Sequence, residues 1–217
     1  MKKYKNLLID LDGTITDSGD AVISCVVYAL EKLGIKDTPY ETLRKFIGPS
    51  LHDSFTRTMG LDEETANKAI ELYRSMYEDN KMYDVTLYDG IAEFMRDASA
   101  AGCKVILVTS KPHEFATKIM DRLDLSQYLH YQTGPDMDDP SSDKCVLIEK
   151  AVRACDLKKE ECVMIGDTRF DIKGAVDAGI DSVGVLYGFG TEEELRETGA
   201  TYIVAKADDL NALYERV

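Results

Sequence analysis

Short apolar runs recur along the chain, and each run is bounded by polar or turn-forming residues. Strands that are covered on both faces of a parallel sheet have such near-continuous apolar runs. Between the runs, apolar residues recur every three to four positions, as they do on one face of a helix. We therefore predict strands at residues 6–10, 104–109, 162–166, 182–186 and 202–204, and helices at residues 91–101, 112–123, 143–154 and 171–178.

Strands that alternate with helices indicate repeated βαβ units, so we expect an α/β fold with a Rossmann-like, doubly wound parallel sheet. The segment from 19 to 80 breaks this alternation, because it shows helical spacing and no convincing strand. Its first helix ends at Gly34, a residue that is common just after helices. The pattern predicts an α/β core domain of residues 1–16 and 82–217 and an inserted all-helical cap domain of residues 17–81.

Two interpretations of the helical insert stay open. It can be structural packing, or it can be a lid that closes over a ligand site. Open α/β sheets bind ligands outside the carboxyl ends of their strands, and the insert begins shortly after the end of the first strand. This placement favours the lid.

The stretch LLIDLDGTITDS, residues 7–18, ends an apolar run in two acids, Asp10 and Asp12. Charged groups are costly to remove from water, so a buried strand should not end in two unpaired carboxylates. Paired carboxylates suit a hard cation such as Mg²⁺, which prefers oxygen ligands. Gly13 follows at the turn, where it relaxes the backbone. The pattern predicts a metal site beside the end of the first strand.

A second acidic pair follows another predicted strand. The stretch VMIGDTRFDIKGA, residues 163–175, contains Asp167 and Asp171. An Asp between a strand and a helix is often only a helix N-cap, and this interpretation of Asp167 stays open. Together with Asp10 and Asp12, however, the second pair favours one shared ion that is held from two distant parts of the chain.

Candidate phosphate-binding groups follow the strand at 104–109. Thr109 and Ser110 close its apolar run, and Pro112 suits the first turn of the next helix. Hydroxyl groups and a helix N-terminus together can bind phosphate, although Ser and Thr are also common helix caps. Lys144 opens a later helix and could pair with phosphate, but an exposed lysine is the favoured interpretation of this residue alone. We expect a solvated acidic loop at residues 136–139.

The charge balance limits the possible partners. The net charge is −14 and the isoelectric point is about 4.6. This argues against nucleic-acid or anionic-membrane binding, because those surfaces attract clustered Lys and Arg. An acidic protein that handles an anionic substrate needs a local cation, and a bound metal would provide one.

Cysteine and histidine usage points away from disulfide, zinc and histidine-based chemistry. The five cysteines are odd in number and form no CxxC pair, as expected for reduced thiols in a cytoplasmic protein. The three histidines are far apart in sequence, so a Ser-His-Asp or Cys-His arrangement has little support. The apolar stretch near the N-terminus is too short for a signal peptide or a membrane span. We expect a cytoplasmic location.

These motifs together resemble the haloacid dehalogenase superfamily of phosphohydrolases. The resemblance rests on four motifs in order, and it spans essentially the whole chain. Three further stretches, FIGPSL, TSKP and GVLYGFG, resemble the branch of phosphoglycolate phosphatases, pyrophosphatases and nucleotidase-like relatives. The four motifs are Asp10-x-Asp12-Gly13-Thr14, Thr109, Lys144 and Gly166-Asp167-xxx-Asp171.

The resemblance implies catalytic and phosphate-binding roles. Asp10 would be the nucleophile that forms an aspartyl-phosphate, and Asp12 would be the general acid and then the general base. Lys144 would neutralise the nucleophile and the phosphate. Phosphate oxygens would be held by Thr109, Ser110, Lys144 and Gly13.

The same resemblance implies the metal and the shape of the molecule. Mg²⁺ would be held by Asp10, by the backbone carbonyl of Asp12 and by Asp167, with Asp171 as an outer ligand. The helical insert would correspond to the family's cap.

The expected function is therefore Mg²⁺-dependent hydrolysis of a small phosphorylated metabolite, of the phosphoglycolate phosphatase type. The alternatives are a 5′-nucleotidase, a pyrophosphatase, a sugar-phosphate mutase and a relative that binds without catalysis. Dehalogenation is disfavoured, because family dehalogenases are not expected to have an acid at the position of Asp12. We expect no nucleic-acid or membrane partner and a monomer or homodimer. Residues 44–50 would set specificity; Arg44 or Lys45 could meet a substrate carboxylate, but solvated side chains are favoured.

Overall fold

The computed structural model describes residues 1–137 and 143–215, which form two compact units. Unit 1 comprises Met1–Asp17 and Leu87–Val217, and unit 2 comprises Ser18–Thr86. The sequence placed the second boundary after residue 81, whereas the structure places it after residue 86. The intervening residues stay with unit 2 because Met82 N–H donates to the Tyr77 carbonyl at 2.7 Å and Asp84 N–H donates to the Lys81 carbonyl at 3.0 Å.

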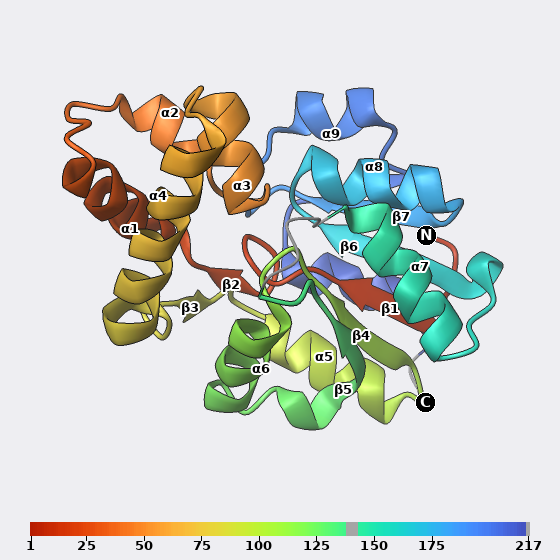
Figure 1. Cartoon of the computed structure of the whole chain (residues 1–217). Helices are drawn as coiled ribbons and strands as arrows, with labels where there is room; N and C mark the ends of the chain where they lie inside the picture. The colour runs from red at the N-terminus through yellow and green to blue at the C-terminus, as the bar shows by residue number, and fades with distance from the viewer. Residues whose placement is uncertain (138–142, 216–217) are drawn as a thin grey trace. The chain divides into compact units, whose positions relative to one another are not determined.

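Unit 1 is built on one parallel sheet of six strands, which confirms the predicted α/β fold. The strand order is β5-β4-β1-β6-β7-β8 (Figure 1). A separate two-stranded sheet is formed by β2 (Thr16–Asp17) and β3 (Thr86–Leu87). The strands of the large sheet are β1 (Asn6–Ile9), β4 (Lys104–Val108), β5 (Leu129–Thr133), β6 (Cys162–Gly166), β7 (Asp181–Val185) and β8 (Tyr202–Val204).

The central position of β1 explains its apolar sequence. Leu7, Leu8 and Ile9 are completely buried, because strands pair with β1 on both sides and helices cover both faces of the sheet. In the parallel ladders Ile9 pairs with Leu107 of β4 on one side and with Ile165 of β6 on the other. The carboxyl ends of β1, β4 and β6 therefore lie side by side at one edge of the sheet.

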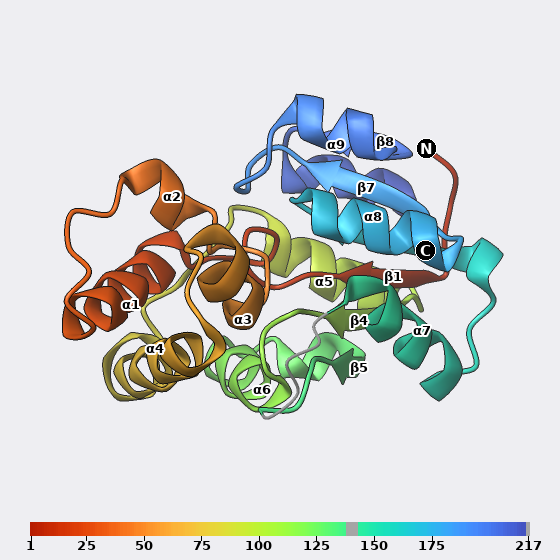
Figure 2. The same ribbon diagram turned by 45° about the horizontal axis from the view of Figure 1, so that its top comes forward.

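Helices cover both faces of the sheet. Two of them, α7 and α8, pack together on one face (Figures 1 and 2), where Leu8, Ile106 and Met164 join the same buried cluster as Ile148 and Ala175. Strand side chains alternate, so Leu7 and Ile9 point to the opposite face. The helices of unit 1 are α5 (Ile91–Ala100), α6 (His113–Arg122), α7 (Lys144–Ala154), α8 (Arg169–Ala178) and α9 (Glu192–Thr198), with 3₁₀ turns η3 (Ser126–Tyr128), η4 (Lys159–Glu161) and η5 (Ala207–Leu213).

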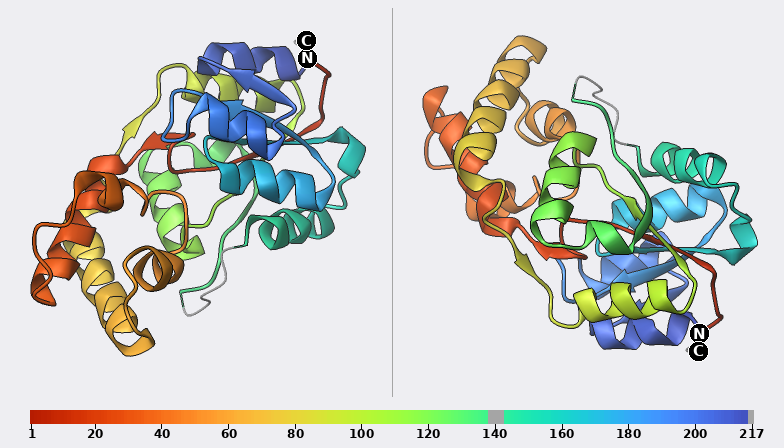
Figure 3. Two further views of the ribbon diagram at one scale, coloured as in Figure 1. Left: turned by 90° about the horizontal axis from the view of Figure 1, so that it is seen from above. Right: turned by 90° about the horizontal axis from the view of Figure 1, so that it is seen from below.

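Segments close to the two ends of the chain meet in unit 1, which Figure 3 shows from above and from below. Tyr4 N–H donates to the Leu213 carbonyl at 2.8 Å. The α5 helix packs against η5, with the Phe94 and Tyr214 ring centroids 6.0 Å apart.

The sequence pattern missed β5 and α9. The β5 sequence LHYQT is only partly buried and lies at an edge of the sheet, so it lacks the apolar run of a central strand. The α9 sequence EEELRET is mostly charged and has one buried residue, Leu195. Asp138 and Asp139 of the expected acidic loop lie outside the described residues.

Unit 2 is helical throughout its principal elements, as predicted. Its first helix buries the apolar face that the sequence indicated, including Ala21, Cys25 and Ala29, and it packs against α4. The Phe46 and Phe55 rings meet edge to face, with centroids 4.9 Å apart. The helices are α1 (Gly19–Lys32), α2 (Tyr40–Arg44), α3 (Leu51–Asp53) and α4 (Glu63–Met76), and the π-helical segments are η1 (Ser54–Thr58) and η2 (Tyr77–Lys81).

Three further findings concern two charged side chains, the cysteines and possible membrane-spanning helices. Arg44 and Lys45 are both exposed. All five cysteines, which lie within the described ranges, are free thiols. Among the described residues, no helix has the length and apolar character that crossing a bilayer would require.

Candidate active site

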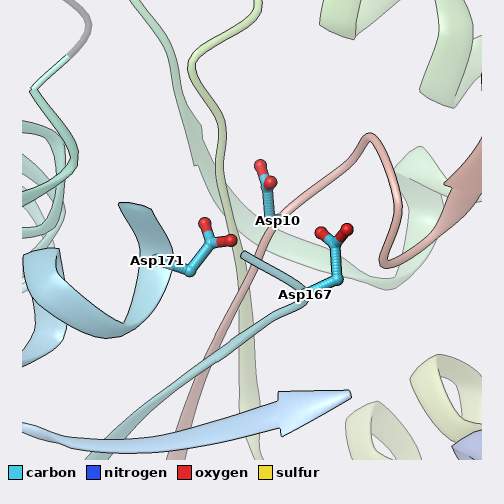
Figure 4. A group of neighbouring side chains, drawn as sticks. All are labelled: Asp10, Asp167 and Asp171. Carbon is cyan, nitrogen blue, oxygen red and sulfur yellow. The ribbon is translucent and has the colours of Figure 1, made fainter. Parts of the chain in front are cut away.

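Three carboxylates meet at the carboxyl edge of the sheet. Asp10 follows β1, Asp167 follows β6, and Asp171 lies on the first turn of α8. Figure 4 shows their side chains facing a common space, and one oxygen of each lies within 4.8 Å of the others. All three residues are buried. Asp10 and Asp167 are brought together because their strands are neighbours and Asp10 N–H donates to the Ile165 carbonyl at 3.0 Å.

Hydrogen bonds at the start of α8 fix Asp171. Its Oδ2 accepts from Thr168 N–H at 3.1 Å and from Thr168 Oγ1 at 3.0 Å. This reciprocal capping arrangement holds the first turn of the helix. The N-cap of α8 is Thr168, so the alternative interpretation of Asp167 as the helix cap is wrong.

Asp167 is held by two segments that are distant in sequence. Its Oδ1 accepts from Thr14 Oγ1 at 3.1 Å, and its Oδ2 accepts from Phe189 N–H at 2.8 Å. Gly13 has φ +86°, and a Cβ added there would lie 2.1 Å from Asp167 Oδ2. A Cβ on Gly188 would lie 2.3 Å from Asp167 Cβ. Glycine at both positions therefore makes room for this carboxylate.

Lys144 lies between the acids. Its Nζ is 2.9 Å from Asp10 Oδ1 and 2.8 Å from Asp171 Oδ1, and it donates to the Val108 carbonyl at 3.1 Å. Only 3% of its side chain is exposed, so the favoured interpretation of an exposed lysine is wrong. A Cβ on Gly174 of α8 would lie 2.6 Å from Lys144 Cβ, so this glycine lets the two helices approach closely enough to bury the lysine.

Burial shifts the proton affinities of these groups. It raises the pKa of Asp10 to about 7, with Lys144 opposing the shift and Asp171 reinforcing it. Burial, followed by the charges of Asp171 and Asp10, holds the pKa of Asp167 well above its usual range. Burial alone would lower the pKa of Lys144, but Asp10 and Asp171 raise it above its ordinary value, so this group stays an ammonium ion.

The Asp12 side chain is not among the three clustered acids. Its Oδ1 instead pairs with Lys111 Nζ at 2.8 Å. The Lys111 backbone N–H donates to Thr109 Oγ1 at 3.1 Å, so Lys111 connects Asp12 with the buried Thr109. Ser110, between them, is partly buried. Sequence reasoning missed Lys111, although it directly follows the two hydroxyl residues in the TSKP stretch.

The charges and atoms of this edge fit a divalent cation. Its four carboxylates (Asp10, Asp12, Asp167 and Asp171) and two ammonium groups (Lys111 and Lys144) leave two formal negative charges uncompensated. Apart from the Lys144 contact, no described residue gives a hydrogen bond to Asp10 Oδ1 or Asp171 Oδ1. Clustered carboxylate oxygens are the ligands that Mg²⁺ prefers.

Comparison with known proteins identifies relatives over nearly the full length. A 5′-nucleotidase of Pseudomonas aeruginosa is 36% identical over 97% of this chain and 94% of its own. The tyrosine-protein kinase PtkA of Mycobacterium bovis is 31% identical over 96% of this chain and 71% of its own. A phosphoglycolate phosphatase of Colwellia psychrerythraea is 28% identical over 92% of each chain.

Solved structures and a family model agree with these relatives. The crystal structure of a predicted phosphatase from Clostridium acetobutylicum superposes with a TM-score of 0.92, at 37% identity and over 97% of each chain. The model of haloacid dehalogenase-like hydrolases matches residues 7–185, which include every acid and both lysines of the site. The match covers most of the chain, and the chain belongs to the haloacid dehalogenase-like hydrolases.

Proposed function

We propose that this hydrolase is a Mg²⁺-dependent phosphatase that cleaves a small phosphomonoester through a phosphorylated Asp10. The observation that carries the proposal is the buried cluster of Asp10, Asp167 and Asp171, in which Asp10 and Asp171 pair with Lys144. Family membership and relatives that are named as phosphatases support the reaction class.

In the first half of the reaction, an oxygen of Asp10 forms a bond to phosphorus while the bond from phosphorus to the substrate's ester oxygen breaks. The leaving oxygen takes a proton from Asp12, so the first product is an alcohol. Lys144, 2.9 Å from Asp10, reduces the repulsion between the attacking carboxylate and the phosphate anion. The covalent intermediate splits one difficult displacement into two easier ones.

In the second half, water attacks the phosphorus of phosphorylated Asp10. Asp12 takes a proton from this water, the bond between Asp10 and phosphorus breaks, and inorganic phosphate leaves. Thr109 and Ser110 are placed at the end of β4, beside the end of β1, where their hydroxyl groups can orient the phosphate oxygens. Gly13 contributes a turn without a side chain at the same edge.

Asp10, Asp167 and the backbone carbonyl of Asp12 would hold the metal, with Asp171 as an outer ligand. When bound, Mg²⁺ supplies positive charge that stabilises the phosphoryl group during transfer. Asp171 already carries a Lys144 contact and the α8 capping bonds, which suits an outer role.

The substrate we propose is a small phosphorylated metabolite, with 2-phosphoglycolate as the first candidate. The second candidate is a nucleoside 5′-monophosphate, because the 5′-nucleotidase of Pseudomonas aeruginosa is 36% identical to this chain. We further propose that the protein acts in the cytoplasm as a monomer or homodimer, without nucleic-acid or membrane partners. Its free thiols and net charge of −14 support this setting.

The test is phosphate release by the purified protein with Mg²⁺ and with EDTA. The panel comprises 2-phosphoglycolate, nucleoside monophosphates, pyrophosphate, a sugar 1-phosphate and p-nitrophenyl phosphate. We expect Mg²⁺-dependent release that Asp10→Asn abolishes. The matched control is Asp177→Asn, which removes an exposed carboxylate of α8 whose ion pair, at 2.6 Å, is with the also exposed Lys173.

Each contrary outcome points elsewhere. Accumulation of an isomeric sugar phosphate would identify a mutase. No phosphate release from any substrate would favour a relative that binds without catalysis. An Asp10→Asn variant with wild-type activity would exclude Asp10 as the nucleophile.

A further inference from the structure

A second lysine lies at the same edge of the sheet as Lys144 but pairs with a different acid. Lys111 Nζ is 2.8 Å from Asp12 Oδ1, and only 7% of the Lys111 side chain and 16% of the Asp12 side chain are exposed. The two lysines thus divide the acids: Lys144 contacts Asp10 and Asp171, whereas Lys111 contacts Asp12. This division separates the proposed nucleophile from the proposed proton carrier.

The backbone of Lys111 is held from two sides. Its N–H donates to Thr109 Oγ1 at 3.1 Å, and a Cβ on Gly134 would lie 2.5 Å from the Lys111 carbonyl oxygen. The neighbouring His113 N–H donates to the Pro135 carbonyl at 2.9 Å. The segment after β5 therefore packs directly against the segment that carries Lys111. This contact restricts the backbone position of Lys111, from which its side chain extends.

An ion pair with so little solvent exposure has structural consequences. Removing one partner leaves the other charge poorly solvated, and that is costly in a buried setting. Asp12 follows the end of β1 by three residues, next to Gly13, and its backbone forms an isolated bridge with Thr16. The ion pair with Lys111, which follows β4, in addition connects the Asp12 side chain to the end of a different strand.

We infer that Lys111 is a positioning residue that holds the Asp12 carboxylate where it exchanges a proton with the leaving oxygen and with water. The inference rests on the proposed phosphatase function and assigns a role to a residue of the TSKP stretch that is not among the four motif residues given roles above. Because Lys111 also donates to Thr109, it links the position of the proton carrier to the position of a phosphate-binding hydroxyl.

A comparison of leaving groups tests this role. Alkyl phosphates need a proton on the departing oxygen, whereas p-nitrophenolate departs without one. General acid catalysis contributes roughly 10²- to 10⁴-fold, and a misplaced acid loses part of this factor. The attack of water on phosphorylated Asp10 is common to both substrates, so the comparison uses kcat/KM, which reports the reaction only as far as the release of the alcohol. For Lys111→Met we expect kcat/KM to fall at least ~10-fold with the best alkyl phosphate of the panel but less than ~3-fold with p-nitrophenyl phosphate.

Three further variants complete the design. Lys118→Met is the matched control, because Lys118 is an exposed α6 lysine paired with Glu114 at 2.6 Å, and it should leave both rates unchanged. Lys111→Arg keeps the charge and should restore part of the alkyl-phosphate rate. If Lys111 acts through Asp12, the double variant with Asp12→Asn should be no slower than Asp12→Asn alone.

The outcomes separate this inference from the proposed function. Equal losses of kcat/KM with both substrates, or additive effects in the double variant, would overturn the positioning role. Equal losses would instead make Lys111 a ligand of the phosphate group that both substrates share. A wild-type protein that releases no phosphate from any substrate of the panel would refute the proposed function itself. Thermal melts check that each variant is folded, and Lys111→Arg provides the same comparison if Lys111→Met does not fold.

Discussion

The substitution Gly188→Ala places one methyl group directly against the proposed metal ligand Asp167. The added Cβ would lie 2.3 Å from Asp167 Cβ, 2.3 Å from the Gly13 carbonyl oxygen and 2.5 Å from Asp167 Oδ2. Real Cβ atoms do not approach other atoms so closely, and two of these neighbours belong to backbone or to the base of a side chain. Either the loop or Asp167 must therefore move.

The size of the effect follows from what the movement breaks. Overpacking a tight site costs about 1–3 kcal/mol. A shift also lengthens the 2.8 Å hydrogen bond from Phe189 N–H to Asp167 Oδ2, and hydrogen bonds to charged groups contribute about 1.5–3 kcal/mol. Groups that orient metal ligands typically change metal affinity by roughly 10- to 100-fold when they are lost. We expect Gly188→Ala to weaken Mg²⁺ binding within that range.

Isothermal titration of the metal-free protein with Mg²⁺ measures this directly, without substrate. Gly184→Ala is the control, because its Cβ would lie 2.9 Å from the Leu195 side chain and so perturbs packing away from Asp167. It should lower the melting temperature without weakening Mg²⁺ binding. Wild-type Mg²⁺ affinity in Gly188→Ala would refute the assignment of this loop, and of Asp167, to metal binding.

Three further predictions concern charge and packing. Without metal, the folded protein keeps a proton on Asp10 up to a pH of about 7, whereas the unfolded chain loses this proton near its ordinary pKa of about 4. Urea denaturation in EDTA should therefore show stability falling as the pH rises from about 5 to 7. Stability that rises over this window would contradict the burial argument. Mg²⁺ should restore stability more at pH 7.5 than at pH 5.5. Lys144→Met leaves buried acids without their cation and should destabilise the metal-free protein by about 3–5 kcal/mol at neutral pH, and an unchanged urea midpoint would count against this ion-pair network. Leu8→Ala should cost about 2–5 kcal/mol in urea denaturation, since Leu8 is fully buried between helices and neighbouring strands; a loss below about 1 kcal/mol would disagree with the observed packing.

Local patterns in the sequence carried most of the fold. The central strands were predictable because burial on both faces demands continuous apolar runs, and β6 was predicted with its observed bounds. The edge strand β8 was also predicted with its observed bounds, because its short sequence YIV is apolar throughout although only partly buried. The α1 helix was equally clear, since one apolar face repeats along it before Gly34. The edge strand β5 was missed because its partial burial leaves no such run.

The residues of the site were visible in sequence as polar groups at the ends of apolar runs, but their contacts were not. Asp10 and Asp167 are 157 positions apart in the chain, and only the pairing of β1 with β6 makes them neighbours. From the sequence alone Lys144 resembled an exposed helix residue, whereas in the structure α8 covers it, with Gly174 allowing the close approach. Nothing in the TSKP stretch indicated that Lys111 would reach Asp12 from a different strand.

The sequence by itself determined which segments form strands and helices and which residue types stand at the strand ends, because periodicity and turn chemistry act over a few neighbouring positions. Tertiary structure alone decided which strand ends adjoin, which lysine pairs with which acid, and how deeply each charge is buried. These properties depend on distances between remote segments, and burial and pairing together determine whether a carboxylate is protonated, binds a cation or attacks a substrate.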